Sequence, residues 1–302
     1  MKIKRLVIAG LLLVSGFSVA SAQVKLSFNP EKGTKYEYRQ EMLSKVKQNV
    51  MGQEVPVDME ISSMYLMEIM DKMPQEIQVQ ITCKEIAYII SSPMMKMGYD
   101  SQSPIENPSD MDHLFGKIIS GLLDSPVMML FSPDGSVKSV TGMDVIADKM
   151  TGAIADDGQI AAQIAVQMKQ QFSESYMKSS FEQMFKIYPD NPVKTGNNWD
   201  MESSVVAANN MNSKVKTKYT LKNINRNMAT VAVESDIEMI PAAGTEGNLA
   251  GTQTGTIIID TKTGLPVKGD FSQNIKGTVS MQGMDVQMET VSNINSTIKE
   301  VK

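Results

Sequence analysis

The sequence is nearly without the residues that most catalytic and metal sites require. Its 302 residues include one cysteine, Cys83, and one histidine, His113. A lone cysteine cannot form an internal disulfide, so we expect Cys83 to be a small buried hydrophobic residue. Zinc and iron centres need several Cys or His ligands, so no such metal site is predicted. A Ser-His-Asp or Cys-His site would need His113, which lies off the apolar stripe of its expected helix and is interpreted as a solvated surface residue.

Excess positive charge is also missing. The formal net charge is −5, and no basic patch is interleaved with aromatic residues. We therefore expect neither nucleic acid nor an anionic membrane surface as a partner. Beyond the first 22 residues, no apolar run is long enough to cross a bilayer, so no transmembrane segment is predicted.

The first 22 residues have the pattern of a cleaved signal peptide. Lys2, Lys4 and Arg5 precede an apolar run over 6–17, and Ala20-Ser21-Ala22 is typical of a cleavage site. We predict cleavage between Ala22 and Gln23. No cysteine lies near that cut, so a lipid anchor is not expected. The product is expected to be soluble, in the periplasm or outside the cell, with 23–302 as a single α+β domain.

Long stretches alternate between apolar and polar residues. From Val55 to Ile69 the odd positions are mostly apolar, which over about fifteen residues indicates a half-buried antiparallel strand far longer than usual. The same alternation occurs over 36–50 and 77–83, and again in much of 215–298. Strands of this length must twist and curl. The sequence therefore predicts a large curved sheet.

The middle of the chain is predicted to be mostly helical. Ser109 or Asp110 can cap a helix, and a longer one is expected from after Asp156-Asp157 to about Tyr188. Between them we expect short strands over 127–131 and 136–140, a turn at 133–135 and a short helix from near Asp144. The apolar stripe of the first helix has i, i+3, i+4 spacing: Met111, Leu114, Phe115, Ile118, Ile119, Leu122 and Leu123. That of the longer helix includes Ile160, Ile164, Met168, Phe172, Tyr176 and Phe181. The predicted fold class is α+β: a large curved antiparallel sheet, half-barrel-like, with amphipathic helices packed on its concave face.

Two motifs invite an enzymatic interpretation. Lys-Thr-Gly occurs at 194–196 and 262–264, and Ser-x-x-Lys at 44–47 and 213–216, as in serine β-lactamases and penicillin-binding proteins. That chemistry needs the serine at a helix start and a Ser-Asp-Asn element. Here the serines lie in strand patterns, the Lys-Thr-Gly matches lie in turns, and Ser-Asp-Asn does not occur. Asp156-Asp157 is more simply a helix cap than a cation site, and no carboxylate pair for glycoside hydrolysis is indicated. We predict that the protein is not an enzyme, with no catalytic residues and no cofactor.

Methionine is the one abundant residue with chemical potential, at 26 copies. Met64, Met67, Met70 and Met73 recur every third residue, and thioethers favour Cu(I). Alternation on a strand, however, places Met64 and Met70 on one face and Met67 and Met73 on the other. We therefore interpret the methionines as adaptable core and lining residues and predict no metal site. Cu(I) binding or oxidant scavenging, with Met94, Met95 and Met97 as the residues to replace, is the minor alternative.

Several turn motifs resemble those of a known family. They are "KGTKYEY" (32–38), "LFSPDGSVKSVTGMD" (130–144), "VKTGNNW" (193–199) and "GTIIIDTKTGLPVKGDFSQNIKG" (255–277). Together they resemble an uncharacterised secreted family of Bacteroidota, domain of unknown function 6263, which carries no known catalytic residues to transfer. The expected architecture is also distantly similar to the half-barrel carriers of the bacterial envelope that bind lipids or lipoproteins.

Two functions fit these patterns about equally. In the first, a periplasmic or extracellular carrier binds an apolar small molecule or lipid between sheet and helices. In the second, a structural or protein-interaction module of the envelope has helices that fill the sheet completely. The sequence indicates no ligand-binding residues and no oligomeric state, and whether the space under the sheet is filled distinguishes the two.

Overall fold

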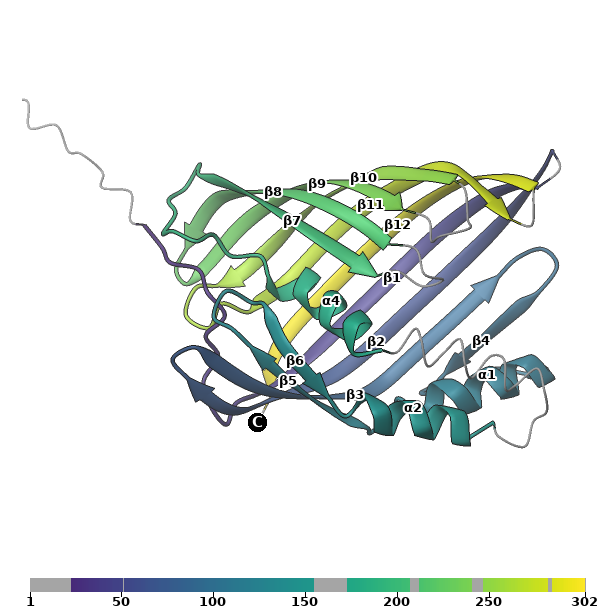
Figure 1. The fold of residues 1–302 in the computed structure, drawn as a ribbon, viewed down its shortest axis with the longest axis horizontal. Helices are drawn as coiled ribbons and strands as arrows, with labels where there is room; N and C mark the ends of the chain where they lie inside the picture. Colours follow the sequence, from purple (N-terminus) through teal and green to yellow (C-terminus); the bar gives the residue numbers. More distant parts are fainter. Residues whose placement is uncertain are drawn as a thin grey trace, which may run out of the picture.

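One large antiparallel sheet forms the body of the molecule (Figure 1). The computed structural model describes residues 23–50, 52–154, 173–206, 212–240, 247–281 and 284–301. The predicted signal peptide and much of the predicted long helix, with Asp156-Asp157, Ile160, Ile164, Met168 and Phe172, lie outside these ranges. The strands are β1 (Lys35–Val50), β2 (Gln53–Met73), β3 (Glu76–Ser91), β4 (Lys96–Asp100), β5 (Pro126–Phe131), β6 (Val137–Thr141), β7 (Asn198–Val206), β8 (Asn212–Asn225), β9 (Met228–Ile240), β10 (Gly247–Asp260), β11 (Pro266–Met281) and β12 (Met284–Val301).

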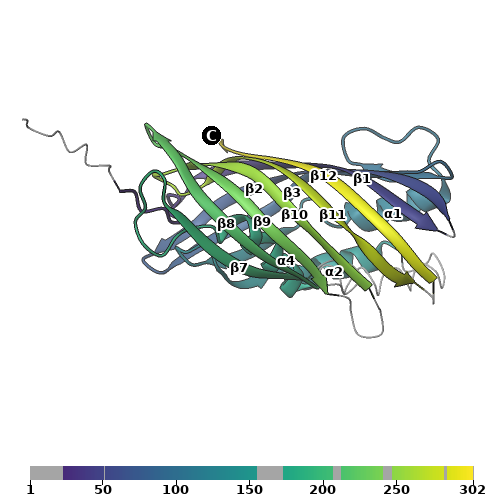
Figure 2. The ribbon, with the colours of Figure 1, turned by 90° about the horizontal axis from the view of Figure 1, so that it is seen from above.

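The strands follow the order β6-β5-β3-β2-β1-β12-β11-β10-β9-β8-β7, and β4 pairs with the remaining half of β3. β2 alone has 21 residues, and the twist of such long strands accumulates into a trough (Figures 1 and 2). The sheet stays open. Helix α4 (Glu174–Phe185) packs against both β6 and β7, so it lies between the two edges of the sheet.

Side chains alternate between the two faces of the sheet, except at β-bulges. In β1, Tyr36, Tyr38 and Val46 are buried on the concave face, whereas Leu43 and Lys45 are exposed on the convex face. The predicted alternation of β1, β2 and β3 is thereby confirmed. The register of β3 against β2 shifts twice: at Lys84, so that Tyr65 faces Cys83 but Met64 faces Glu85, and at Met70, between the pairs of Ile69 and Asp71.

One end of the trough is filled by a dense core. Phe28, Phe131 and Phe185 are fully buried, with ring centroids 5.0 to 5.4 Å apart. The segment 23–34 crosses this end: the Phe28 amide donates to the Pro133 carbonyl oxygen (2.8 Å) and the Asn29 amide to that of Thr263 (2.7 Å). We call this the closed end. The open end is the opposite one, where β1 joins β2 and β3 joins β4.

The helices lie on the concave side, as predicted (Figure 2). Phe115 of α1 (Asp110–Ser120) packs against Tyr88 of β3 at 5.3 Å, and Phe181 of α4 packs against Tyr65 of β2 at 6.3 Å. Helix α2 (Met143–Gly152) buries Ile146 and Met150. Among the described residues, no helix is long and apolar enough to cross a membrane.

Some boundaries differ from the predicted ones. Helix α1 ends at Ser120, so Leu122 and Leu123 lie beyond it. Helix α4 ends at Phe185 and not near Tyr188, because the chain extends there and Tyr188 reaches the turn between β10 and β11, where its hydroxyl donates to the Gly264 carbonyl oxygen (2.6 Å). Strands β4 and β7 were not predicted.

Candidate ligand-binding surface

The concave face is organised in rows that run across the strands. Residues opposite each other in neighbouring strands share a row, and successive rows lie two residues apart, about 7 Å, along each strand. Three rows cover the middle of the trough. The closed-side row is Ile61, Met42, Ile294, Phe271, Gly255, Val233, Tyr219 and Trp199. The polar row is Ser44, Ser292, Gln273, Gln253, Ser235 and Thr217. The open-side row is Val57, Val46, Thr290, Ile275, Gly251, Ile237 and Val215.

The polar row crosses six strands as three hydrogen-bonded pairs. The hydroxyls of Ser44 and Ser292 lie 2.7 Å apart, and those of Thr217 and Ser235 lie 2.9 Å apart. Between them, the Gln273 amide nitrogen donates to the Gln253 amide oxygen at 3.3 Å. The four hydroxyl residues are buried, whereas both glutamines are half-buried. The central pair is therefore the accessible part of the row.

The closed-side row is apolar and contains a glycine that makes room for an aromatic ring. A β-carbon at Gly255 would lie 2.5 Å from Cδ1 of Phe271, which faces it from β11. A β-carbon at Gly269 would also meet the same ring at 2.9 Å. The ring of Phe271 therefore occupies the space above the backbone of β10 and β11 at the two glycines, and the closed-side row presents an apolar surface there.

The open-side row is apolar except for Thr290, and it is less tightly packed than the closed end. Val46 and Ile237 are each 7% exposed, against 0% for Phe28 and Phe131. Ile275 and Val57, in the same row, are only half-buried. The adjoining part of β2 and β3 is similar, with half-buried inward side chains at Val55, Met59, Ile86 and Ile90. The part of the open half that β2 and β3 form therefore presents an apolar surface that the described residues do not bury completely, whereas the inward side chains of Leu249, Val279 and Val286 on β10, β11 and β12 are buried.

No charged residue occupies any of these three rows. Tyrosines are their titratable neighbours, and burial raises the pKa values of Tyr38 and Tyr65, whose rings stack at 5.9 Å. Burial likewise raises the pKa of Tyr219 to about 12. Tyr38 donates its hydroxyl proton to the Gln40 amide oxygen at 2.6 Å, which also favours the neutral phenol. The three rows therefore stay uncharged across the physiological pH range.

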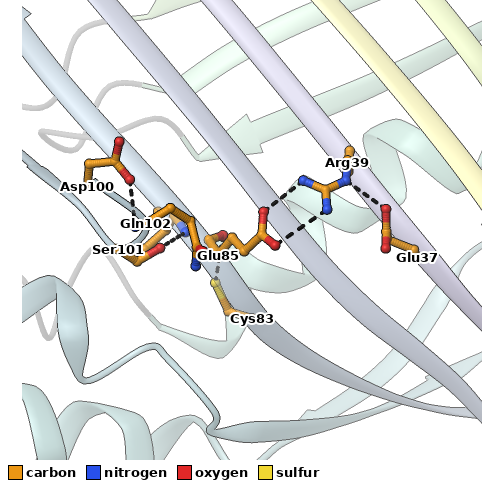
Figure 3. Close-up of polar contacts among 8 residues, drawn as sticks. Glu37, Arg39, Cys83, Glu85, Asp100, Ser101 and Gln102 are labelled. Atoms are coloured by element: carbon orange, nitrogen blue, oxygen red, sulfur yellow. Dashed lines mark hydrogen bonds and ion pairs between the residues drawn. The ribbon is translucent and has the colours of Figure 1, made fainter. Parts of the chain in front are cut away.

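The convex face carries the charges. Arg39 of β1 reaches across β2 to Glu85 of β3, with Nη1 2.7 Å from Oε2, and also contacts Glu37 at 2.6 Å (Figure 3). The register places Met64 between Arg39 and Glu85 on this face, so the ion pair spans it. The long arginine side chain can therefore cover part of this outward methionine, whereas Met70 on the same strand is 43% exposed. A hollow of about 410 Å³ lies near the open end of β1 and β12, and its lining combines charged side chains, such as Lys47 and Glu289, with a single large apolar one, Met288.

The motifs that suggested an enzyme serve structural roles. Gly196 and Gly264 both occupy turns at positive φ, +90° and +73°, so the turn interpretation of both Lys-Thr-Gly matches is confirmed. In each Ser-x-x-Lys match the residues lie three apart on a strand and face opposite sides: Ser44 and Ser213 point inward, while Lys47 and Lys216 are exposed. The arrangement that β-lactamase chemistry requires is absent from both matches.

The structure also places His113, Cys83 and the methionines of the β3–β4 hairpin. His113 is exposed on α1, as predicted. Cys83 is buried, and burial raises its pKa to about 12. The described residues contain no cluster of three His, Cys, Asp or Glu side chains suited to a metal. Met94 is 84% exposed at the β3–β4 hairpin, whereas Met97 pairs with Ile90. Cu(I) binding by these methionines stays a hypothesis.

Sequence reasoning did not find the polar row, although a signal for it exists. Gln273 and Gln253 sit at inward positions of strands whose other inward residues are apolar or glycine, so each interrupts an apolar stripe. Such an interruption marks a polar site on a buried face, but it becomes a row only when the register is known.

Comparison with known proteins gives family membership but no activity. No curated protein sequence matches the chain significantly. Among solved structures, lipovitellin, from a study of its lipid–protein interactions, is similar with a TM-score of 0.48 and 12% identity, over 91% of this chain but only 26% of that chain. An exported protein with a YmcC-like fold from Bacteroides fragilis gives 0.28 and 10% identity (92% and 100% covered), and an outer membrane channel from Pseudomonas putida gives 0.23 and 6% (90% and 98% covered). With every TM-score below 0.5, none of these structures defines the function of this chain.

The comparison with protein-family models, unlike the comparison with solved structures, shows which family the chain belongs to. A family model matches residues 74–266, well over half of the chain, and this range includes three of the four turn motifs wholly or in part. The chain belongs to the Family of unknown function (DUF6263).

Proposed function

We propose that the protein is an exported, non-enzymatic binding protein that carries an apolar ligand on the middle and open part of its concave face. The observation that carries this proposal is the contrast between the two halves of the trough. At the closed end, Phe131 and Phe185 are fully buried, whereas Met42 and Ile275 nearer the open end are only half-buried although they point inward. Partly buried apolar side chains on a concave, uncharged wall are the usual lining of a site for apolar molecules.

The abundance of methionine supports the same proposal. Met42 and Met59 lie on this wall, and the unbranched, polarisable methionine side chain adapts to ligands of different shape. The signal-like segment 1–22 supports export. The ligand itself is described only as apolar and neutral where it contacts the wall.

A structural module is the second candidate, and one observation favours it. Phe28, from the N-terminal segment, joins the core of sheet and helices, so the closed end is filled completely and leaves no room for a ligand there. In a structural module that binds no ligand, side chains would be expected to fill the whole trough in the same way. The half-buried wall near the open end supports the carrier instead.

Uptake of the apolar fluorescent dye 1-N-phenylnaphthylamine tests the proposal. Saturable binding is expected for the wild-type protein, and native mass spectrometry of protein purified from its own host is expected to show a co-purifying apolar molecule. Neither saturable dye uptake nor a bound molecule would leave the structural module as the better candidate.

Adjacent residues of β1 provide a matched pair of variants. Met42 points into the trough and Leu43 points to solvent, where it is 53% exposed. Met42→Gln is expected to weaken dye binding about fivefold, because part of the apolar contact is lost. Leu43→Gln introduces the same side chain on the other face and is expected to leave dye binding unchanged.

A further inference from the structure

The central glutamine pair of the polar row has hydrogen-bonding capacity that the described residues do not use. A primary amide has one carbonyl oxygen and an NH2 group. One bond links the two amides, from the Gln273 nitrogen to the Gln253 oxygen. This leaves the Gln273 carbonyl oxygen and the Gln253 NH2 group without a partner in the described part of the chain. If the two amides were oriented the other way round, one carbonyl and one NH2 group would still remain.

The unused groups are accessible. Among the described residues, no fully buried side-chain nitrogen or oxygen atom lacks a hydrogen-bond partner. The spare carbonyl and NH2 groups of the pair must therefore lie at the surface of the trough, and both glutamines are half-buried. The hydroxyl pairs of the same row differ, because Ser44 and Ser292 are buried and bonded to each other.

The surroundings restrict what such a pair can bind. Apolar rows flank the pair on both sides along the strands, with Phe271 and Gly255 toward the closed end and Ile275 and Gly251 toward the open end. No charged residue lies in the three rows, so a charged group would be desolvated here without a counter-charge. A fitting group is neutral, both donates and accepts a hydrogen bond, and has apolar chains on either side. A secondary amide has all three properties, whereas an ester only accepts.

We propose that Gln253 and Gln273 bind the secondary amide of an N-acylated alkylamine whose two apolar chains lie along the flanking rows. The ligand amide N–H donates to the free glutamine carbonyl, and its carbonyl oxygen accepts from the free NH2 group. This inference rests on the proposed carrier function and names the chemical class of its ligand.

Competition against bound 1-N-phenylnaphthylamine tests the inference with three matched probes: N-hexylhexanamide, its N-methyl derivative and hexyl hexanoate. The secondary amide is expected to displace the dye at about fivefold lower concentration than the other two, because only it can both donate and accept. Equal displacement by all three probes would overturn the inference while leaving the carrier function in place. Absence of dye binding, together with the absence of a co-purifying apolar molecule, would overturn the carrier function itself.

Variants test whether the preference for the secondary amide depends on Gln253 and Gln273. Gln253→Met combined with Gln273→Met replaces both amides by apolar side chains of similar length, and the preference for the secondary amide is expected to disappear while dye binding persists. If this double variant does not fold, Gln253→Asn, which keeps the amide but shortens the side chain, is expected to reduce the preference. Ser44→Ala combined with Ser292→Ala is the control in the same row and should retain it. A preference that survives the loss of both glutamines would place the amide elsewhere.

Discussion

Gly264 lies directly against the backbone of Ser27. A β-carbon at Gly264 would sit 1.8 Å from the Ser27 carbonyl oxygen, and the residue also has a φ of +73°. The turn between β10 and β11 therefore packs so closely against the N-terminal segment that Gly264 has no room for a β-carbon. Gly264→Ala is expected to destabilise the protein by about 3 kcal/mol or more, because the N-terminal segment must move away from the core. Urea denaturation followed by circular dichroism measures this change.

Gly196 is the matched control, since it ends the other Lys-Thr-Gly turn. Its φ is +90°, but no atom lies within 4 Å of a β-carbon built there. Gly196→Ala is expected to cost only the strain of a left-handed residue, about 1 kcal/mol. Equal losses in the two variants would show that crowding against Ser27 contributes nothing.

Asp112 secures the edge strand β4 to helix α1. Its Oδ1 accepts from the Gly98 amide (2.7 Å), and its Oδ2 accepts from the Ser109 hydroxyl and amide (2.6 and 2.8 Å). Asp112→Ala is expected to destabilise the protein by about 1–3 kcal/mol at pH 7, because the cap and a buried amide both lose their acceptor. Ser109→Ala removes only the cap hydroxyl and should cost less; a larger loss in Ser109→Ala would contradict the role given to Gly98.

Asp112 also gives the protein a predictable sensitivity to acid. Hydrogen bonds from Ser109 and then from Gly98, with the nearby His113, lower the pKa of this carboxyl in the folded state. The resulting stabilisation is fully present above the unfolded pKa of about 3.9 and is lost as the pH falls through the lower folded value. The wild-type protein should therefore lose stability more steeply than Asp112→Asn as the pH falls below about 4. Parallel pH profiles for the two proteins would contradict this assignment.

The ion pair between Arg39 and Glu85 is exposed, so its contribution should be small and sensitive to salt. Two guanidinium nitrogens contact the two carboxylate oxygens, at 2.7 and 3.4 Å, and the pair spans Met64. A double-mutant cycle is expected to give a coupling of about 0.5–1 kcal/mol that shrinks in 1 M salt. The pair of Lys216 and Glu202, at a single 3.5 Å contact, is the comparison and should show almost none. Equal coupling in the two pairs would argue against the paired geometry of Arg39.

Much of this fold could be predicted because its information is local. Inward residues such as Met67 and Ile69 follow a period of two along one strand, and the α1 stripe follows 3.6. Each of these periodicities can be recognised within a short stretch of sequence, so the strands, the helices and the curved sheet could be inferred. Strand β7 could not, because Trp199 and Met201 share its inward face with Ser203, and the alternation is weak.

The candidate site was beyond prediction because its information is not local. Ser44 and Ser292 are separated by 248 positions in the sequence and meet only through the pairing of β1 with β12. Gln253 and Gln273 lie on one hairpin, but a two-residue change in its turn would have placed other residues opposite each other. The packing at the closed end could not be predicted for the same reason, because no residue near Phe28 in the sequence indicates its contact with Phe131 and Phe185.

Cys83 should be unreactive in the native protein despite the oxidising conditions expected outside the cell. Burial raises its pKa to about 12, so the thiolate that reacts with alkylating reagents is almost absent at pH 8. Its thiol lies at the β-bulge, 3.6 Å from the Glu85 carbonyl oxygen (Figure 3). Iodoacetamide is expected to label the native protein at least a hundredfold more slowly than the urea-unfolded chain, in keeping with a thiolate population lowered by about three powers of ten. Mass spectrometry of samples taken over time measures both rates, and Cys83→Ala serves as the unlabelled control. Rapid labelling without urea would show that the strand around the bulge opens readily, and would place Cys83 on an accessible part of the wall.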